Sequence, residues 1–282
     1  MDRWQAAWET RMSGYAPQIG FVRPNRTLPI SLTGTTCALD CAHCGGHYLS
    51  GMVSIACADA TNATSCLISG GCDARGAVPV TSHLQEVSLL RPGRLLNWHV
   101  GMVNVEDMDR IAPLVDVISF DIVGDDSTIR EVYGLDHRAE DYFRTYELLR
   151  QRFVVVPHLT LGLRAGRFSG EYQALEAFHT APPEALVILV LVPTVGTRFA
   201  ECRAPDTEQV ASFLLAARLK LPKTLIYLGC MRPGGRYRQE LDPLAVRAGV
   251  NKIVNPAPSA VQLAPDLGLE IRWEHECCVF QR

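Results

Sequence analysis

The feature of this sequence that most constrains its fold is a repeated alternation between short apolar runs and longer amphipathic stretches. Such alternation is typical of strand–helix units that build a parallel sheet. Several runs are continuously apolar, as expected for strands covered on both faces. The pattern predicts an α/β fold with a full or partial TIM-type (β/α) barrel. The expected strands are 30–36, 65–69, 95–100, 117–121, 153–161, 186–192, 224–228 and 250–254, and the expected helices include 139–152, 169–179 and 207–219.

A barrel of this kind accounts for most of the 282 residues, so we expect one main domain. We assign residues 26–257 to the barrel and residues 1–25 to an N-terminal extension. Residues 258–282 are expected to form a C-terminal tail that closes over the barrel mouth. Hydrophobic residues make up 48% of the sequence, which is enough for a large core and argues against global disorder.

Charge and hydropathy exclude several classes of partner. Basic and acidic side chains number 27 and 30, and no arginine or lysine block stands out, so no nucleic-acid partner is expected. The longest apolar run, 185–193, is far shorter than the ~20 residues that span a bilayer. The first residues lack the apolar segment of a signal peptide. We therefore expect a cytoplasmic protein with no membrane partner.

Polar and glycine-rich segments follow or end most of the predicted strands. In such barrels the chemistry is located at the carboxyl ends of the strands, so we expect these segments to meet on one face. For the histidines among them, packing in the core is as good an interpretation as lining a pocket. The segments contain Cys37, SGGC at 69–72, His99, Asp121, His158, TVGT at 194–197 and Cys230.

Three cysteines stand close together after the first predicted strand. Cys37, Cys41 and Cys44 have the spacing C-x3-C-x2-C. Thiolates this close suit an iron–sulfur cluster or another thiophilic metal. A structural zinc site is the alternative, but it usually takes four ligands in two separated pairs. The spacing therefore favours a [4Fe–4S] cluster with three protein ligands, which leaves one iron free to bind a substrate or cofactor.

This motif, on a loop after the first strand of a barrel, resembles the signature of the radical S-adenosylmethionine (SAM) superfamily. His43 occupies the position before the last cysteine, which is commonly aromatic in that family. The resemblance implies that Cys37, Cys41 and Cys44 hold the catalytic cluster and that SAM binds its open iron. It also implies an electron donor, whose electron splits SAM into methionine and a 5′-deoxyadenosyl radical that abstracts a substrate hydrogen.

The same resemblance implies a set of SAM-binding residues. The segment at 69–71 resembles the glycine-rich strand end that contacts the SAM amino group, and the segment at 192–197 resembles the later strand that packs near the adenine. Where the family often has a glutamate after the glycines, this chain has Cys72, which replaces a SAM contact with a candidate metal ligand. An ordinary loop or capping role is the alternative throughout. The set is His43, Ser69, Gly70, Gly71, Ser119, Asp121, Thr194 and Gly196.

The other cysteines divide into two groups. Cys57, Cys66 and Cys202 carry no partner signature, so burial in the core is the favoured interpretation. Cys72, Cys230 and the adjacent pair of cysteines at 277 and 278 lie at predicted strand ends or in the tail. If the tail crosses the barrel mouth, Cys72, Cys230, Cys277 and Cys278 can hold an auxiliary iron–sulfur cluster, with scattered buried thiols as the alternative.

An auxiliary cluster beside a radical generator points to sulfur insertion into a C–H bond. The strings GGHYL at 45–49, SGGCD at 69–73 and GCMRPG at 229–234 resemble the biotin-synthase-like branch, and most closely the two-component lipoyl synthases. That resemblance implies a sister radical SAM subunit and an octanoylated lipoyl carrier protein as partners. The alternatives are a radical SAM rearrangement, methylation or cofactor-maturation step without sulfur transfer, and a non-catalytic metal-binding barrel.

Overall fold

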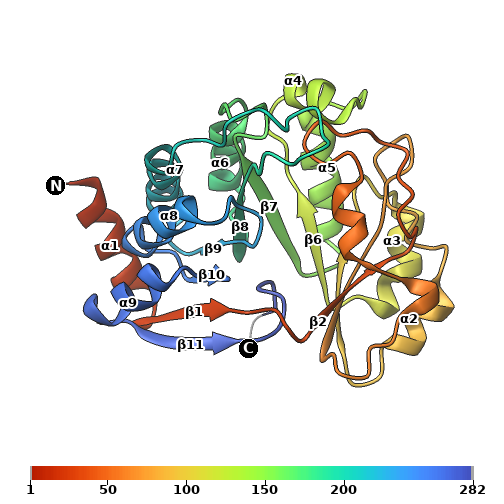
Figure 1. Ribbon diagram of the computed structural model, residues 1–282, viewed down its shortest axis with the longest axis horizontal. Helices are drawn as coiled ribbons and strands as arrows, with labels where there is room; N and C mark the ends of the chain where they lie inside the picture. Colours follow the sequence, from red (N-terminus) through yellow and green to blue (C-terminus); the bar gives the residue numbers. More distant parts are fainter. Residues whose placement is uncertain (1, 281–282) are drawn as a thin grey trace.

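The computed structural model describes residues 2–280, in which one parallel sheet is covered by helices along its outer side (Figure 1). The strands are β1 (Gln18–Val22), β2 (Thr27–Ser31), β3 (Val53–Ser54), β4 (Ser65–Ser69), β5 (Leu95–His99), β6 (Val117–Asp121), β7 (Val155–Leu161), β8 (Ala185–Val190), β9 (Leu225–Leu228), β10 (Lys252–Val254) and β11 (Glu270–Glu274). The helices are α1 (Arg3–Gly14), α2 (Leu84–Leu90), α3 (Val105–Ile111), α4 (Asp126–Thr128), α5 (Ala139–Arg150), α6 (Glu171–Thr180), α7 (Thr207–Lys220), α8 (Arg236–Arg247) and α9 (Pro258–Asp266). Shorter helical turns are η1 (His47–Gly51), η2 (Ile55–Cys57), η3 (Ala112–Leu114) and η4 (Ile129–Tyr133).

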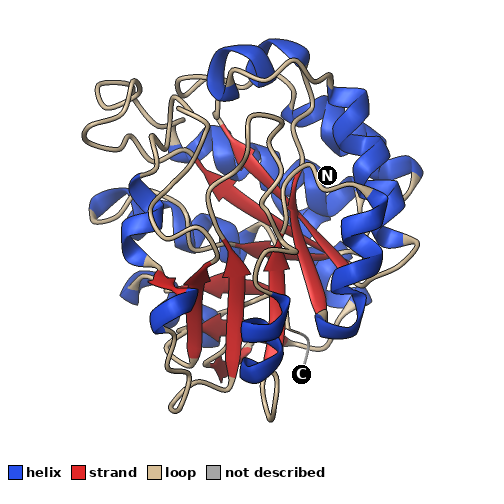
Figure 2. Cartoon of the chain, turned by 90° about the vertical axis from the view of Figure 1, so that its right-hand side faces the viewer, coloured by secondary structure: helices blue, strands red, loops and turns tan. Residues whose placement is uncertain are grey.

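The sheet curves into a half-barrel that does not close. Within residues 2–280 its eleven strands follow the order β11-β1-β10-β9-β8-β7-β6-β5-β4-β2-β3. Every neighbouring pair is parallel, and β3 and β11 form the two edges. Figure 2 shows the helices outside the curved strands. The predicted α/β fold is confirmed in its partial, TIM-type form.

The eight predicted strands are all present, as β2 and β4 to β10. The first of them was placed too far along the chain, because residues 32–36 already belong to the loop that follows β2. Three strands were not predicted: β1, β3 and β11. β1 lies between β10 and β11, where a Cβ atom on Gly20 would come within 2.9 Å of Lys252 and Glu274. Segments from both predicted extensions therefore contribute strands to the sheet.

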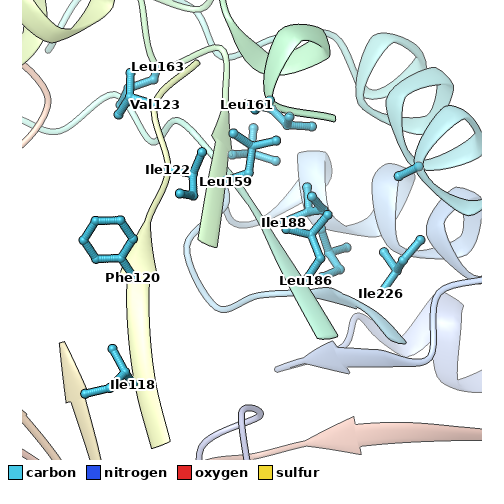
Figure 3. Packing of buried hydrophobic residues seen from close by; sticks show 14 of the residues in the cluster. Ile118, Phe120, Ile122, Val123, Leu159, Leu161, Leu163, Leu186, Ile188 and Ile226 are labelled. Carbon is cyan, nitrogen blue, oxygen red and sulfur yellow. The ribbon is translucent and has the colours of Figure 1, made fainter. Parts of the chain in front are cut away.

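Alternate residues of each strand face the helices and form the main core. Figure 3 shows buried residues of three successive strands of the sheet, Ile118 and Phe120 on β6, Leu159 on β7, and Leu186 and Ile188 on β8. The same core takes in the apolar faces of the covering helices. Among residues 2–280, no helix is both long and apolar enough to cross a bilayer.

The opposite, concave face of the sheet carries a second apolar cluster. Strand residues such as Val117, Val187 and Tyr227 pack there against the tail residues Val279 and Phe280. Several of these strand residues are near the amino ends of their strands, so the tail fills the concave face at that level. The carboxyl ends of β4 to β7 carry polar residues on the same face, and these form the candidate site.

Candidate functional site

The three motif cysteines lie on the long loop between β2 and η1. All three side chains are half-buried, and all ten cysteines of the chain are free thiols. The backbone N–H groups of Cys44 and Gly45 both donate to the carbonyl of Cys41, at 2.9 Å each. Gly45 and Gly46 then take positive φ angles of 50° and 76°, which glycine adopts without steric cost. The loop thus turns back on itself directly after the last cysteine.

Close backbone packing joins this loop to the segment after β4. The N–H of Cys72 donates to Cys37 Sγ over 3.3 Å, and the N–H of Ala38 donates to the Cys72 carbonyl over 2.8 Å. A Cβ atom on Gly71 would lie 2.0 Å from the Thr36 oxygen and 2.7 Å from Cys37 Cα. Only glycine therefore fits at 71, and the reason visible in the structure is the approach of the cysteine loop itself.

The middle of the cysteine loop is held on its other side by two further segments. Ala42 is fully buried, and its N–H donates to the Val132 carbonyl of η4 at 2.7 Å. Its carbonyl accepts from the N–H of Phe199, in the loop after β8, at 3.0 Å. Arg198 Nη2 donates to the carbonyl of Asp40 at 2.9 Å. The loop after β8 therefore lies against the loop that carries the cysteines.

The predicted adenine-side residues belong to that same loop after β8. Thr194 is buried, and its hydroxyl shares a hydrogen bond with Tyr48 over 2.8 Å. Gly196 has a φ of 82° and open space around its Cα, which suits a tight turn. Both residues thus lie in the segment that contacts the cysteine loop, although their contacts visible here are structural.

His43 projects into the protein from between two of the cysteines. Its ring packs edge-on against Tyr133, with 5.6 Å between the ring centroids. Burial lowers the pKa of this imidazole to about 4, despite the opposing charge of Asp121. Its Nδ1 is buried without a hydrogen-bond partner, and such orphaned groups are costly unless a ligand or water satisfies them. A polar ligand bound beside the cysteine loop would meet this need.

Two thiols of this region, those of Cys41 and Cys72, are held in their protonated form by their surroundings. Burial, followed by neighbouring thiols, raises the pKa of Cys41 and of Cys72 to about 12. A metal that binds them must displace these protons, because the thiolate is the ligand. Cys72 interacts with Cys37 and Cys41, which places it beside the motif cysteines.

The donor set of the loop is that of an iron–sulfur cluster in residue type and number. Within residues 2–280 no three histidine, cysteine, aspartate or glutamate side chains come close enough together to hold one metal ion. A tetrahedral zinc ion needs its sulfur ligands to converge to about 2.3 Å from one centre. A [4Fe–4S] cluster distributes its thiolates over different irons, so its ligands are farther apart. The three half-buried thiols of the loop are a suitable donor set for the latter.

Three titratable side chains line the concave face, those of His99 and Asp121 at the ends of β5 and β6 and that of His158 in the middle of β7. His99 Nε2 lies 3.2 Å from Asp121 Oδ2, and His158 is paired in register with Asp121. The side chains of His99 and Asp121 are 35% and 40% exposed, so they are open to a ligand. Burial opposes ionisation of Asp121, but the charge and hydrogen bond of His99 prevail and lower its pKa to about 2.

The pKa values of the two histidines are shifted in opposite directions. Asp121 overcomes burial and raises the pKa of His99. Burial lowers the pKa of His158 to about 4, and its Nδ1 is 3.1 Å from the Val156 carbonyl. At neutral pH His158 is therefore uncharged. Its Nδ1–H then donates to that carbonyl, which leaves Nε2 as an acceptor.

The predicted serines of the site are buried and engaged with neighbouring strands. Ser119 Oγ donates to Asn97 Oδ1 at 2.9 Å, and Ser69 Oγ donates to the His99 carbonyl at 3.0 Å. A Cβ atom on Gly70 would lie 3.1 Å from Thr33 Oγ1, and that same hydroxyl accepts from the Gly71 N–H at 2.7 Å. These contacts link β4 and β6 to β5, and the segment after β4 to the segment after β2.

The remaining predicted metal ligands lie apart from the motif. Cys230 is exposed after β9, whereas Cys278 is buried beside Tyr227. Cys277 is half-buried, and its charge acts on both Cys230 and His99. Cys72 is thus grouped with the motif cysteines, and Cys230 with the tail.

Comparisons with known proteins relate the chain to others through its fold. No protein-family model matches the sequence, and no curated protein matches it either. A structure of methylornithine synthase (PylB) matches 96% of this chain and 88% of its own, with a TM-score of 0.67 and 13% identity. The FeFe-hydrogenase maturase HydG from Carboxydothermus hydrogenoformans matches 95% of this chain and 71% of its own, with a TM-score of 0.70 and 15% identity. The chain shares their fold.

Sequence reasoning missed the residues that hold the cysteine loop in place. Ala42, Val132, Phe199 and Arg198 act through backbone atoms or reach across the fold, so no local motif marks them. Thr33 was also missed, and its position shortly before the first cysteine is the only signal that the sequence offers for it, because its contact with Gly71 joins two distant segments.

Proposed function

We propose that this chain is a radical SAM enzyme whose [4Fe–4S] cluster is held by Cys37, Cys41 and Cys44. The observation that carries the proposal is the loop geometry: three half-buried thiols at the carboxyl end of β2, fastened on both sides by backbone hydrogen bonds. The fold likeness adds support, because both structural neighbours are radical SAM enzymes.

Other residues are proposed to bind SAM beside the cluster. When bound, the cluster and SAM supply the electron transfer and the carbon radical that such enzymes use. His43 offers a buried ring with an unsatisfied nitrogen, and Asp121 offers a carboxylate that stays ionised. The remaining proposed SAM contacts, made by backbone or hydroxyl groups, are those of Ser69, Gly70, Gly71, Ser119, Thr194 and Gly196.

SAM cleavage tests this proposal directly. The full chain, reconstituted anaerobically with iron and sulfide and then reduced, is expected to convert SAM to 5′-deoxyadenosine. The Cys37/Cys41/Cys44 triple alanine variant should form none, whereas Cys57→Ala, which removes an exposed thiol elsewhere, should behave as wild type. If wild-type protein with full iron content forms no 5′-deoxyadenosine, the proposal is overturned. The interpretation as a non-catalytic metal-binding barrel is then favoured.

For the reaction itself we propose sulfur insertion of the lipoyl synthase type on a carrier-bound octanoyl chain. What supports it is a second group of thiols near the concave face, Cys230 with Cys277 and Cys278, in addition to the motif cysteines. The proposed auxiliary cluster draws on these thiols and on Cys72. An electron donor, a sister radical SAM subunit and an octanoylated lipoyl carrier protein are the partners that this reaction requires.

The second candidate is a radical SAM reaction without sulfur transfer. The position of Cys72 beside Cys37 favours it, because that thiol is then grouped with the motif rather than with Cys230. Iron and sulfide counts on the triple alanine variant separate the two reactions. Retention of a full second cluster supports sulfur insertion, and loss of all iron supports the alternative.

A further inference from the structure

The concave face of the sheet carries a polar level next to the apolar level that the tail fills. Val117 of β6 and Val156 of β7 belong to the apolar cluster that contains Phe280. Alternate residues of a strand share a face, so Asp121 and His158 lie on the same face further along these two strands. The tail covers the apolar level, and the polar level beside it is left for a ligand.

His99, the last residue of β5, is fixed on two sides. Its Nε2 lies 3.2 Å from Asp121 Oδ2, and its carbonyl accepts a hydrogen bond from Ser69 Oγ at 3.0 Å. The side chains of His99 and Asp121 are both partly exposed. Because Nε2 faces the carboxylate, Nδ1 is the ring atom of His99 that is left for a ligand. Asp121 keeps its Oδ1 for the SAM contact proposed above.

His158 uses its two ring nitrogens in the reverse way. Its Nδ1 lies 3.1 Å from the Val156 carbonyl, so Nδ1–H donates and Nε2 holds the lone pair. No group within residues 2–280 bonds this Nε2, which is not enclosed as the unpartnered Nδ1 of His43 is. The ring centroids of His99 and His158 are 5.9 Å apart. Two hydrogen bonds of about 3 Å each can therefore join both rings to one small group.

The charges of these side chains offset one another. Against the effect of burial, the charge and hydrogen bond of His99 lower the pKa of Asp121 to about 2. Also against burial, Asp121 raises the pKa of His99, which favours the ring with a proton on both nitrogens. Burial lowers the pKa of His158 to about 4, so this ring is uncharged. A ligand carboxylate would face Asp121 and a ligand ammonium would face His99, and like charges side by side oppose binding.

We propose that His99 and His158 form a binding site for a carboxamide group of the substrate, whose carbonyl oxygen accepts from His99 Nδ1–H and whose N–H donates to His158 Nε2. A carboxamide fits because it is neutral and both accepts and donates hydrogen bonds. Asp121 is a positioning residue for His99. To call the ligand a substrate rests on the proposed function, whereas the site itself rests on the contacts and charges of these three side chains.

Three probes of equal chain length test the ligand class: hexanamide, hexanoate and hexylamine. Each is titrated into the cluster-loaded full chain under anaerobic conditions without a reductant, and binding is measured by saturation-transfer NMR. Wild type is expected to bind hexanamide at least about tenfold more tightly than either charged probe. Equal affinity for hexanoate or hexylamine, or no binding of hexanamide, would overturn the proposal.

Variants of His158 test the acceptor. His158→Phe retains a ring but lacks the acceptor nitrogen, so its affinity for hexanamide should fall at least about tenfold. His158→Gln offers a side-chain oxygen in place of Nε2 and should recover part of that affinity. His179→Phe, a change at an exposed residue of α6, is the matched control and should bind hexanamide as wild type does. Unchanged affinity in His158→Phe, or an equal loss in His179→Phe, would refute the assignment.

A second measurement needs no substitution. In the wild-type full chain with isotope-labelled histidine, hexanamide should shift the Nε2 resonance of His158 and leave that of His179 in place. An unshifted His158 resonance at saturating hexanamide contradicts the site even if the variants fail to fold.

SAM cleavage, measured separately, distinguishes this site from the proposed function. Protein that forms 5′-deoxyadenosine but does not prefer hexanamide overturns the carboxamide site and leaves the radical SAM proposal intact. Protein that prefers hexanamide but forms no 5′-deoxyadenosine keeps the site and overturns the radical SAM proposal.

Discussion

Replacement of Gly71 by alanine tests the packing beneath the cysteine loop. The new Cβ atom would lie 2.0 Å from the carbonyl oxygen of Thr36 and 2.7 Å from both Cα and Cβ of Cys37. Ordinary van der Waals contact begins near 3.4 Å, so the backbone must move by more than an ångström. The φ angle at 71 is not in the left-handed region, so the whole effect comes from lost space.

The expected cost follows from the nature of the obstacle. Overpacking typically destabilises a protein by about 1–3 kcal/mol, and backbone atoms cannot rotate aside as a side chain does. Since 1 kcal/mol shifts the melting temperature of a domain of this size class by about 2–4 °C, we expect a drop of roughly 2–12 °C in cluster-free protein. Because the clash falls on Cys37, iron content after reconstitution should fall as well.

Differential scanning fluorimetry and colorimetric iron analysis measure the two effects. Gly51→Ala is the matched control, because no atom lies within 4 Å of its added Cβ and its φ is not positive. It should leave both quantities unchanged. A Gly71→Ala protein with the melting temperature and iron content of wild type would refute the view that close loop packing requires glycine at this position.

Three further perturbations have defined outcomes. In Asp121→Asn, His99 loses the charge and hydrogen bond that oppose burial most strongly, so its pKa should fall relative to wild type; an unchanged NMR titration of the His99 ring would contradict this. Arg232→Met leaves the fully buried carboxylate of Asp242 unpaired and should lower the free energy of unfolding by about 3–5 kcal/mol in urea titrations, with Asp242→Asn in the same background recovering part of the loss. Arg198→Ala removes hydrogen bonds to the cysteine loop and to η4, so a chelator should remove iron from this variant faster than from the control Arg203→Ala. Equal rates of iron loss would disprove the contribution of Arg198.

The strands could be predicted where local sequence and final environment agree. The apolar residues of β4 to β10 that face the helices are buried. They form short hydrophobic runs in the sequence, and these runs predict the strands. β11 carries the sequence EIRWE, and its side chains remain largely exposed, so no such run marks it. It is a strand because β1 pairs with it over the full length of both, which is a contact between the two ends of the chain.

The candidate site also has a part that the sequence predicts and a part that only the fold brings together. Cys37, Cys41 and Cys44 are neighbours in sequence, so their spacing alone predicts a shared metal group. The grouping of Cys72 with Cys37, and of Cys277 with Cys230, depends on which strand ends lie side by side. The sequence analysis grouped Cys72, Cys230, Cys277 and Cys278 at one candidate site, because nothing in the sequence states how far apart two strand ends are on a curved sheet.

The sequence by itself determined the parallel α/β architecture, the end of the sheet that carries the candidate site and the three-cysteine motif, because each depends on residues close in the chain. Only the tertiary structure decided that the barrel stays open, that Gly71 and Ala42 are enclosed by distant backbone, and that the tail leaves Cys277 half-buried while it buries Cys278. Those features arise from pairings across long loops, whose geometry is set by the packing of the whole chain rather than by any local pattern.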